Sequence, residues 1–180
     1  MRKIICALVA LLALSCVARA QSDWDTYPER AVGQLVREHS GEEYQKSDLT
    51  ISAQPFPSKT KLTYTGKHRP VGEYKKFLIR VWVESRNVPA SNADLLVEEY
   101  LFKEGDAEYW MPVHNQIVPF FEKELKPGDE VTAFFFFLGG LNEKKLIEKD
   151  TKKDKKEKEK AAVNVRDGME WVFVLEEFQK

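Results

Sequence analysis

Hydrophobic and polar positions recur with short periods along most of the chain, and these periods predict its elements. Residues 73–84 (EYKKFLIRVWVE) alternate between an apolar and a mixed face, which predicts the clearest strand of the chain. Residues 130–138 (EVTAFFFFL) are apolar on both parities, so we expect a strand that is covered on both faces. Shorter alternating runs predict further strands at residues 59–65, 94–104, 107–111 and 170–178.

Turn and cap signals separate these runs. Gly105-Asp106 predicts a tight hairpin turn, and Pro127-Gly128 ends a short amphipathic helix that begins between Asn115 and Val118. A second helix is expected within residues 22–41. Its expected start is a capping box formed by Thr26 and Glu29, with Pro28 in the first turn. The remaining polar stretches predict a surface loop at residues 42–58, with a short strand at 49–53 as an open alternative, and a turn or bulge at residues 66–70.

The order of these elements is strand, strand, a hairpin of strands, helix, strand, charged loop and strand. It resembles the OB fold, in which a helix falls between the third and fourth strands, and small exported bacterial domains of that kind. The resemblance covers residues 59–178 and rests on element order, while the extra hairpin at Gly105 departs from a five-strand pattern. We therefore expect a mainly β fold with two helices, an OB-like antiparallel barrel with the N-terminal helix packed on it. The alternative is an α+β antiparallel sheet with both helices on one face.

The first twenty residues have the pattern of a secretory signal peptide. Arg2 and Lys3 precede an apolar run that is too short to span a membrane, and the segment ends in a small-residue cleavage motif at Ala20. Both cysteines lie within it, so the mature chain is expected to form no disulfide and to be periplasmic or secreted. The alternative is a lipoprotein acylated at Cys16, although the preceding residues lack the usual aliphatic position of a lipobox.

Cleavage would leave an N-terminal helix and wrapping loop at residues 21–58 and an OB-like domain at residues 59–180. Removing the three basic residues of the signal lowers the formal net charge from −1 to −4, which argues against a nucleic-acid binder. Within residues 142–162, nine lysines are interleaved with six acidic residues, so a charged flexible loop is expected there. A weak nucleic-acid interaction through this lysine-rich loop stays an alternative.

Catalytic signatures are scarce in the sequence. The mature chain has no cysteine, no nucleophile-elbow motif and no phosphate-binding glycine pattern. His39, His68 and His114 lack metal-ligand spacing, so no catalytic residue, metal site or cofactor is expected. The alternative is an envelope-associated hydrolase with a site near His68, Arg69 and His114.

Binding is the better-supported class of function. The OB resemblance implies a ligand face on the second and third strands and their loops. Mapped on this chain, that face would present Arg80 and Trp82, with Tyr100 or Lys103 across the sheet and the Tyr109-Trp110 pair nearby. An arginine beside aromatic rings can stack on planar ligands, while the plainer interpretation is that Trp82 and Trp110 cover the barrel beneath the N-terminal helix as part of the packing. We expect an exported binding or assembly module for a peptide, protein or glycan, without catalysis.

Overall fold

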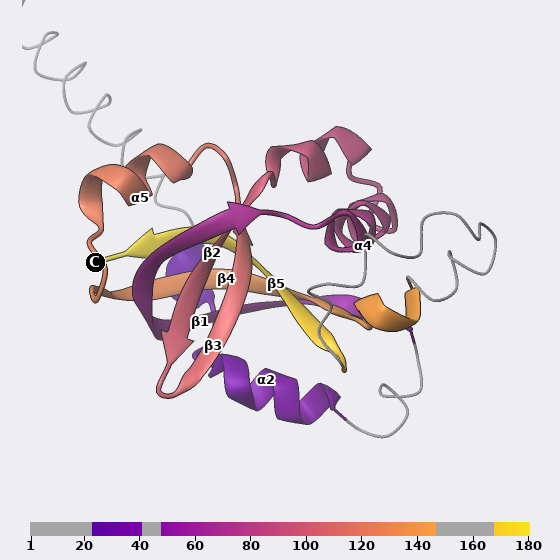
Figure 1. Ribbon diagram of the computed structural model, residues 1–180, viewed down its shortest axis with the longest axis horizontal. Helices are drawn as coiled ribbons and strands as arrows, with labels where there is room; N and C mark the ends of the chain where they lie inside the picture. Colours follow the sequence, from indigo (N-terminus) through magenta and orange to yellow (C-terminus); the bar gives the residue numbers. More distant parts are fainter. Residues whose placement is uncertain (1–22, 41–47, 147–167) are drawn as a thin grey trace, which may run out of the picture.

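The computed structural model describes residues 23–40, 48–146 and 168–180 (Figure 1). This part of the chain is mainly β. Its five strands pair in the order β1-β2-β3-β5-β4, and β4 also pairs with β1, so the strands form a closed ring. The pair of β3 and β5 is parallel and the other pairs are antiparallel, so the sheet is mixed rather than wholly antiparallel as expected. The strands are β1 (Leu49–Pro70), β2 (Glu98–Glu104), β3 (Ala107–Val113), β4 (Glu130–Leu141) and β5 (Glu170–Gln179).

Helical segments surround this strand ring. In chain order they are the 3₁₀ helix η1 (Asp23–Thr26), α2 (Val32–His39), α4 (Glu73–Glu84), the 3₁₀ helix η2 (Ala90–Leu95) and α5 (Val118–Glu124). Both α4 and η2 belong to the connection between β1 and β2, whereas α5 connects β3 to β4. In Figure 1, α2, α4 and α5 lie at three different places around the ring.

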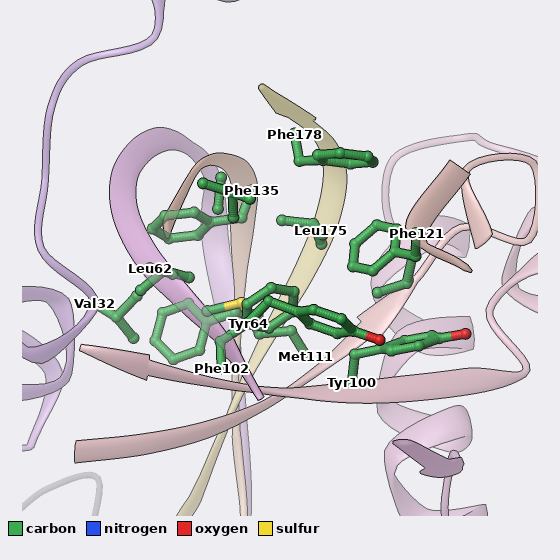
Figure 2. Close-up of a cluster of buried hydrophobic side chains, with 14 of the residues drawn as sticks. Val32, Leu62, Tyr64, Tyr100, Phe102, Met111, Phe121, Phe135, Leu175 and Phe178 are labelled. Carbon is green, nitrogen blue, oxygen red and sulfur yellow. The ribbon is translucent and has the colours of Figure 1, made fainter. Parts of the chain in front are cut away.

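The interior of the ring is one aromatic-rich core. Alternate residues of every strand point into it, and Phe121 of α5 and Val32 and Leu35 of α2 join them, all fully buried. Figure 2 shows this cluster, with Phe121 packed beside Tyr100. The N-terminal helix therefore contributes to the same core as the strands.

A second apolar cluster lies on the outside of β4 and β5, beneath α4. Leu78, Ile79 and Val83 of α4 pack there against outward-facing residues such as Leu138 and Val174. Strand β4 is consequently covered on both faces, which confirms the prediction from its apolar residues on both parities.

The clearest sequence prediction was nevertheless wrong, because residues 73–84 form helix α4. Alternation would have placed Phe77 on a buried face, but Phe77 is 53% exposed. The buried positions are Lys75, Leu78, Ile79 and Val83, which share one side of a helix. The hydrophobic pattern of residues 73–84 fits the period of a strand and that of a helix. Burial against β4 and β5 favours the helix. Five of the six expected strands therefore remain.

The N-terminal helix also starts later than expected, at Val32. Thr26 lies at the end of η1, and Glu29 forms an isolated parallel bridge with Lys59, so the expected capping box is not a helix start. The cap comes instead from Glu104 of β2. Its carboxylate accepts hydrogen bonds of 2.9 and 2.8 Å from the backbone N–H groups of Val32 and Gly33.

The expected loop at 42–58 is corrected within its described part, and the turn at 66–70 is corrected as well, since β1 runs through residues 49–70. The alternative of a short strand at 49–53 is confirmed as the start of β1. Gly66, with φ of 78°, accompanies the register shift at which β1 bends along β2. The expected strand at 94–104 begins only at Glu98, and the strand predicted at 107–111 continues to Val113. The hairpin at Gly105, the helix before Pro127 and the strands at 130–138 and 170–178 are confirmed.

Two expectations lie outside the described residues: the signal peptide at 1–20 with Cys16, and most of the charged loop at 142–162. Within the described ranges, no helix has the length and hydropathy needed to cross a membrane.

Candidate functional site

The expected binding residues do not share one surface. Arg80 and Trp82 stand on helix α4, where Arg80 is exposed and its Nη2 lies 3.0 Å from Asp94 Oδ1. Trp82 is half-buried, and its ring centroid lies 6.3 Å from that of Phe136 on β4. These two residues therefore belong to the packing of α4, and a strand face shared by them does not exist.

The other three expected residues are divided between the inside and the outside of the ring. Tyr100 lies in the interior core, and burial, with a smaller effect of Glu98, raises its pKa to about 12. Tyr109 is half-buried, with its ring edge-on to Phe173. Trp110 is also half-buried, and the Arg69 guanidinium lies 4.2 Å from the centroid of its ring. Trp110 is thus covered by Arg69, a residue of the alternative hydrolase site and not of the expected binding face.

Arg69 leads into a buried ion cluster that the sequence pattern did not reveal. Lys75 of α4 is 3% exposed and Glu99 of β2 is 1% exposed, and the two form an ion pair. Lys75 Nζ also lies 2.9 Å from Glu170 Oε1 of β5, while Arg69 Nε donates a 2.5 Å hydrogen bond to Glu99. Two cations face two carboxylates, so each charge is compensated. We interpret this cluster as the attachment of α4 to the ring.

A cavity of about 210 Å³ lies beside this attachment, between α4, η2 and the outer face of β4 and β5. Most of its walls are apolar, formed by Ile79, Val83, Val88, Leu96, Phe136, Leu138 and Val174. Its polar and amphipathic lining residues are Trp82, Asn92, His114 and Glu176. An apolar cavity with a few polar groups is the usual form of a small-ligand site.

Strand register explains why His114 and Glu176 meet in this cavity. Val113 at the end of β3 pairs in parallel with Leu175 of β5, so the next residue of each strand lies at the same level. Since Val113 and Leu175 both point into the core, the residues that follow them point outward. Sequence reasoning singled out His114 but not Glu176, because their pairing joins segments about sixty residues apart.

Two of these side chains are incompletely satisfied. The indole Nε1 of Trp82 is buried and has no hydrogen-bond partner within the described chain. Glu176 forms no hydrogen bond or ion pair with any described residue, and desolvation raises the pKa of its carboxyl group. His114 Nδ1 accepts a 3.3 Å hydrogen bond from the Gln116 N–H, which leaves the proton of the neutral ring on Nε2. The Trp82 indole Nε1 is buried and Glu176 is half-buried. A buried polar group without a partner calls for an explanation, and a ligand in the cavity can supply a partner to both side chains.

The residues of the alternative hydrolase site do not converge. His68 Nδ1 lies 2.6 Å from Glu98 Oε2, and the His68 ring stacks on Tyr100. Arg69 belongs to the ion cluster, whereas His114 lines the cavity under α4. Among the described residues, no serine, threonine or cysteine lines the cavity, and none of them form a cluster of three potential metal ligands.

Comparisons with known proteins leave the assignment to the geometry. No protein-family model, curated protein or solved structure matches the chain.

Glu176 should make the stability of the protein depend on pH. An acid whose pKa is raised by folding holds its proton in the folded state after the unfolded chain has released it. Stability therefore falls as the pH rises from the ordinary value of 4.5 through the raised pKa. We expect Glu176→Gln to gain stability over wild type as the pH rises from 4 to 7, as measured by urea unfolding.

Glu177→Gln on the same strand is the matched control for the removal of one carboxylate from β5, and the divergence assigned to Glu176 is measured against it. A difference between Glu176→Gln and wild type that stays constant from pH 4 to pH 7 would contradict a raised pKa for Glu176.

Proposed function

We propose that this protein is an exported binding module built on an OB-like barrel, and that the cavity beneath α4 is its ligand site. The single observation that carries the binding role is Glu176, a desolvated acid without a partner in a cavity with apolar walls. The export component rests on the signal-like pattern of residues 1–20.

The strand arrangement supports the OB-like part of the proposal. With residues 73–84 assigned to a helix, the ring has five strands among the described residues, and α5 falls between the third and fourth. That is the position of the helix in an OB barrel. OB folds also bind ligands through the connection between the first two strands, and here that connection supplies α4 and η2, the roof of the cavity.

The proposed ligand site lies away from the face of β2 and β3, which OB folds commonly use, and the contacts on that face explain why. In that region Glu99 is covered by Lys75 and Arg69, and Arg69 stacks on Trp110. These groups already have partners, so binding there would first break buried ion pairs, which is costly. The cavity offers Glu176 without that cost.

A neutral probe and two matched variants test the cavity. Benzyl alcohol, titrated into ¹⁵N-labelled protein, should shift the backbone amide signals of cavity residues such as Ile79 and Val174. Leu96→Phe should abolish these shifts because Leu96 is buried against the cavity and a larger side chain fills it. Val97→Phe is the control, since the neighbouring Val97 is 48% exposed and does not line the cavity.

The proposal predicts at least about a tenfold loss of affinity in Leu96→Phe, which corresponds to roughly 1.4 kcal/mol. Shifts that fall on other surfaces, or equal binding to both variants, would show that the cavity is a packing defect and not a ligand site.

A further inference from the structure

The charge and size of the cavity indicate which class of ligand it takes. We infer that it binds a small organic cation, an amine carried on an apolar body of about one ring. This inference rests on the proposed function, because it requires the cavity to be a ligand site.

Size sets the upper limit on the ligand. An engineered protein cavity of about 150 Å³ lined by apolar side chains is large enough to hold benzene. The cavity here encloses about 210 Å³, so it has room for one ring and a short polar substituent. Its walls of aliphatic side chains and Phe136 suit an apolar ring and give a polymeric sugar or a nucleotide few partners.

Glu176 sets the charge. Glu176 lines the cavity and is half-buried, and no described residue supplies it with a counter-charge. Partial removal of a carboxylate from water is costly, and an ammonium group placed beside it relieves that cost and adds a charge-assisted hydrogen bond. An anionic ligand would add a like charge to the same small space. A neutral ligand would gain only the apolar contacts.

The ionisable groups near Glu176 leave its carboxylate without a counter-charge, which a ligand can supply. His114 lines the same cavity but forms no ion pair with Glu176. Tyr27 follows η1 directly, and burial, with a smaller effect of the nearby Glu176, raises the pKa of its hydroxyl group, so Tyr27 remains uncharged. Arg86 lies over Trp82, with its Cζ 4.8 Å from the ring centroid, and donates to the Ser52 carbonyl oxygen. None of these groups neutralises Glu176.

Trp82 adds a second contribution in favour of a cation. It lines the cavity, and a tryptophan ring attracts positive charge within about 6 Å of its centroid. Arg86 already lies over this ring, so the contribution of Trp82 to a ligand is the smaller one and Glu176 sets most of the preference for a cation. Glu176 and Trp82 together therefore discriminate against anions.

Three probes of one shape separate charge from apolar binding. Benzylamine, benzyl alcohol and benzoate are titrated by calorimetry at pH 7 into wild type, Glu176→Gln and the neighbouring control Glu177→Gln. Wild type should bind benzylamine about tenfold more tightly than benzyl alcohol and should bind benzoate most weakly. Glu176→Gln should lose the preference for the amine, whereas Glu177→Gln should keep it.

The outcomes distinguish this inference from the proposed function. Equal affinity for benzylamine and benzyl alcohol, a preference for benzoate, or an amine preference that survives in Glu176→Gln would overturn the cation inference and leave the cavity as a ligand site. Failure of all three probes to bind would overturn the ligand site itself, and the inference with it.

Discussion

Replacing Lys75 by methionine lowers the free energy of unfolding by about 3–5 kcal/mol, the cost of leaving a buried charge without its partner. Lys75 is 3% exposed and is the contact of α4 with both Glu99 and Glu170. Without it, two carboxylates remain with Arg69 alone, and Glu99 is 1% exposed. The apolar stem of methionine keeps most of the packing, so the loss of stability reports the removal of the charge. Urea unfolding followed by circular dichroism measures it.

The control lies one residue away on the same helix. Lys76 is partly exposed and pairs with Glu73 at the surface, so Lys76→Met should cost less than about 1 kcal/mol. Adding Glu99→Gln to Lys75→Met should recover part of the loss, because it removes one uncompensated charge. Similar effects of Lys75→Met and Lys76→Met would mean that the cluster is hydrated and contributes little.

The Lys75 cluster also has a consequence for the cavity. Lys75, Ile79 and Val83 lie on one side of α4, so the ion pairs that fix the start of the helix also fix the roof over Glu176. A loosened helix should weaken binding in the cavity even though Lys75 does not line it. The proposed ligand site would thus depend on the paired charge of Lys75 near the start of α4 and on the unpaired Glu176 near its end.

Local signals in the sequence predicted the elements that depend on local chemistry. The Gly105-Asp106 hairpin needs a residue that tolerates positive φ, and Gly105 has φ of 59°. Helix α5 ends before the Pro127-Gly128 pair, and β4 shows its double burial directly in its composition. These features depend on neighbouring residues, which a single sequence contains.

Features that depend on residues far apart in the chain were missed, because a single sequence does not show which distant segments meet. The period of residues 73–84 fits a strand and a helix, and only the outer face of β4 and β5 selects the helix. Glu104 caps α2 from about seventy residues away, and no spacing rule connects them. The cavity requires the parallel pairing of β3 with β5, which brings Glu176 to the level of His114. Among the five expected binding residues, only Trp82 lines that cavity, and its role in binding stays a prediction; His114, from the alternative hydrolase site, lines it as well.

Gly139→Ala should be the most damaging change of a single methyl group in the ring. Gly139 has φ of 142°, a backbone conformation that residues with a side chain rarely adopt. It also lies at a register shift in the pairing of β4 with β5. A Cβ atom at this position would lie 2.0 Å from the backbone oxygen of Thr50 in β1. Backbone atoms of a paired strand cannot move aside as a side chain can. Strain and overlap together should cost more than about 3 kcal/mol in the free energy of unfolding.

Gly105→Ala separates the two contributions. Gly105 also has positive φ, but a Cβ atom there meets nothing within 4 Å, so only the conformational cost of about 1–2 kcal/mol applies. Thermal and urea unfolding of both variants should therefore show a larger loss for Gly139→Ala, together with faster amide exchange at Thr50 and Ile51, where β1 pairs with β4. Equal losses in the two variants would mean that β1 yields without cost and that the ring is not held closed at this point. A larger loss in Gly139→Ala would instead show that the close approach of Gly139 to Thr50 is required to close the ring. The outer face of that ring carries the cavity.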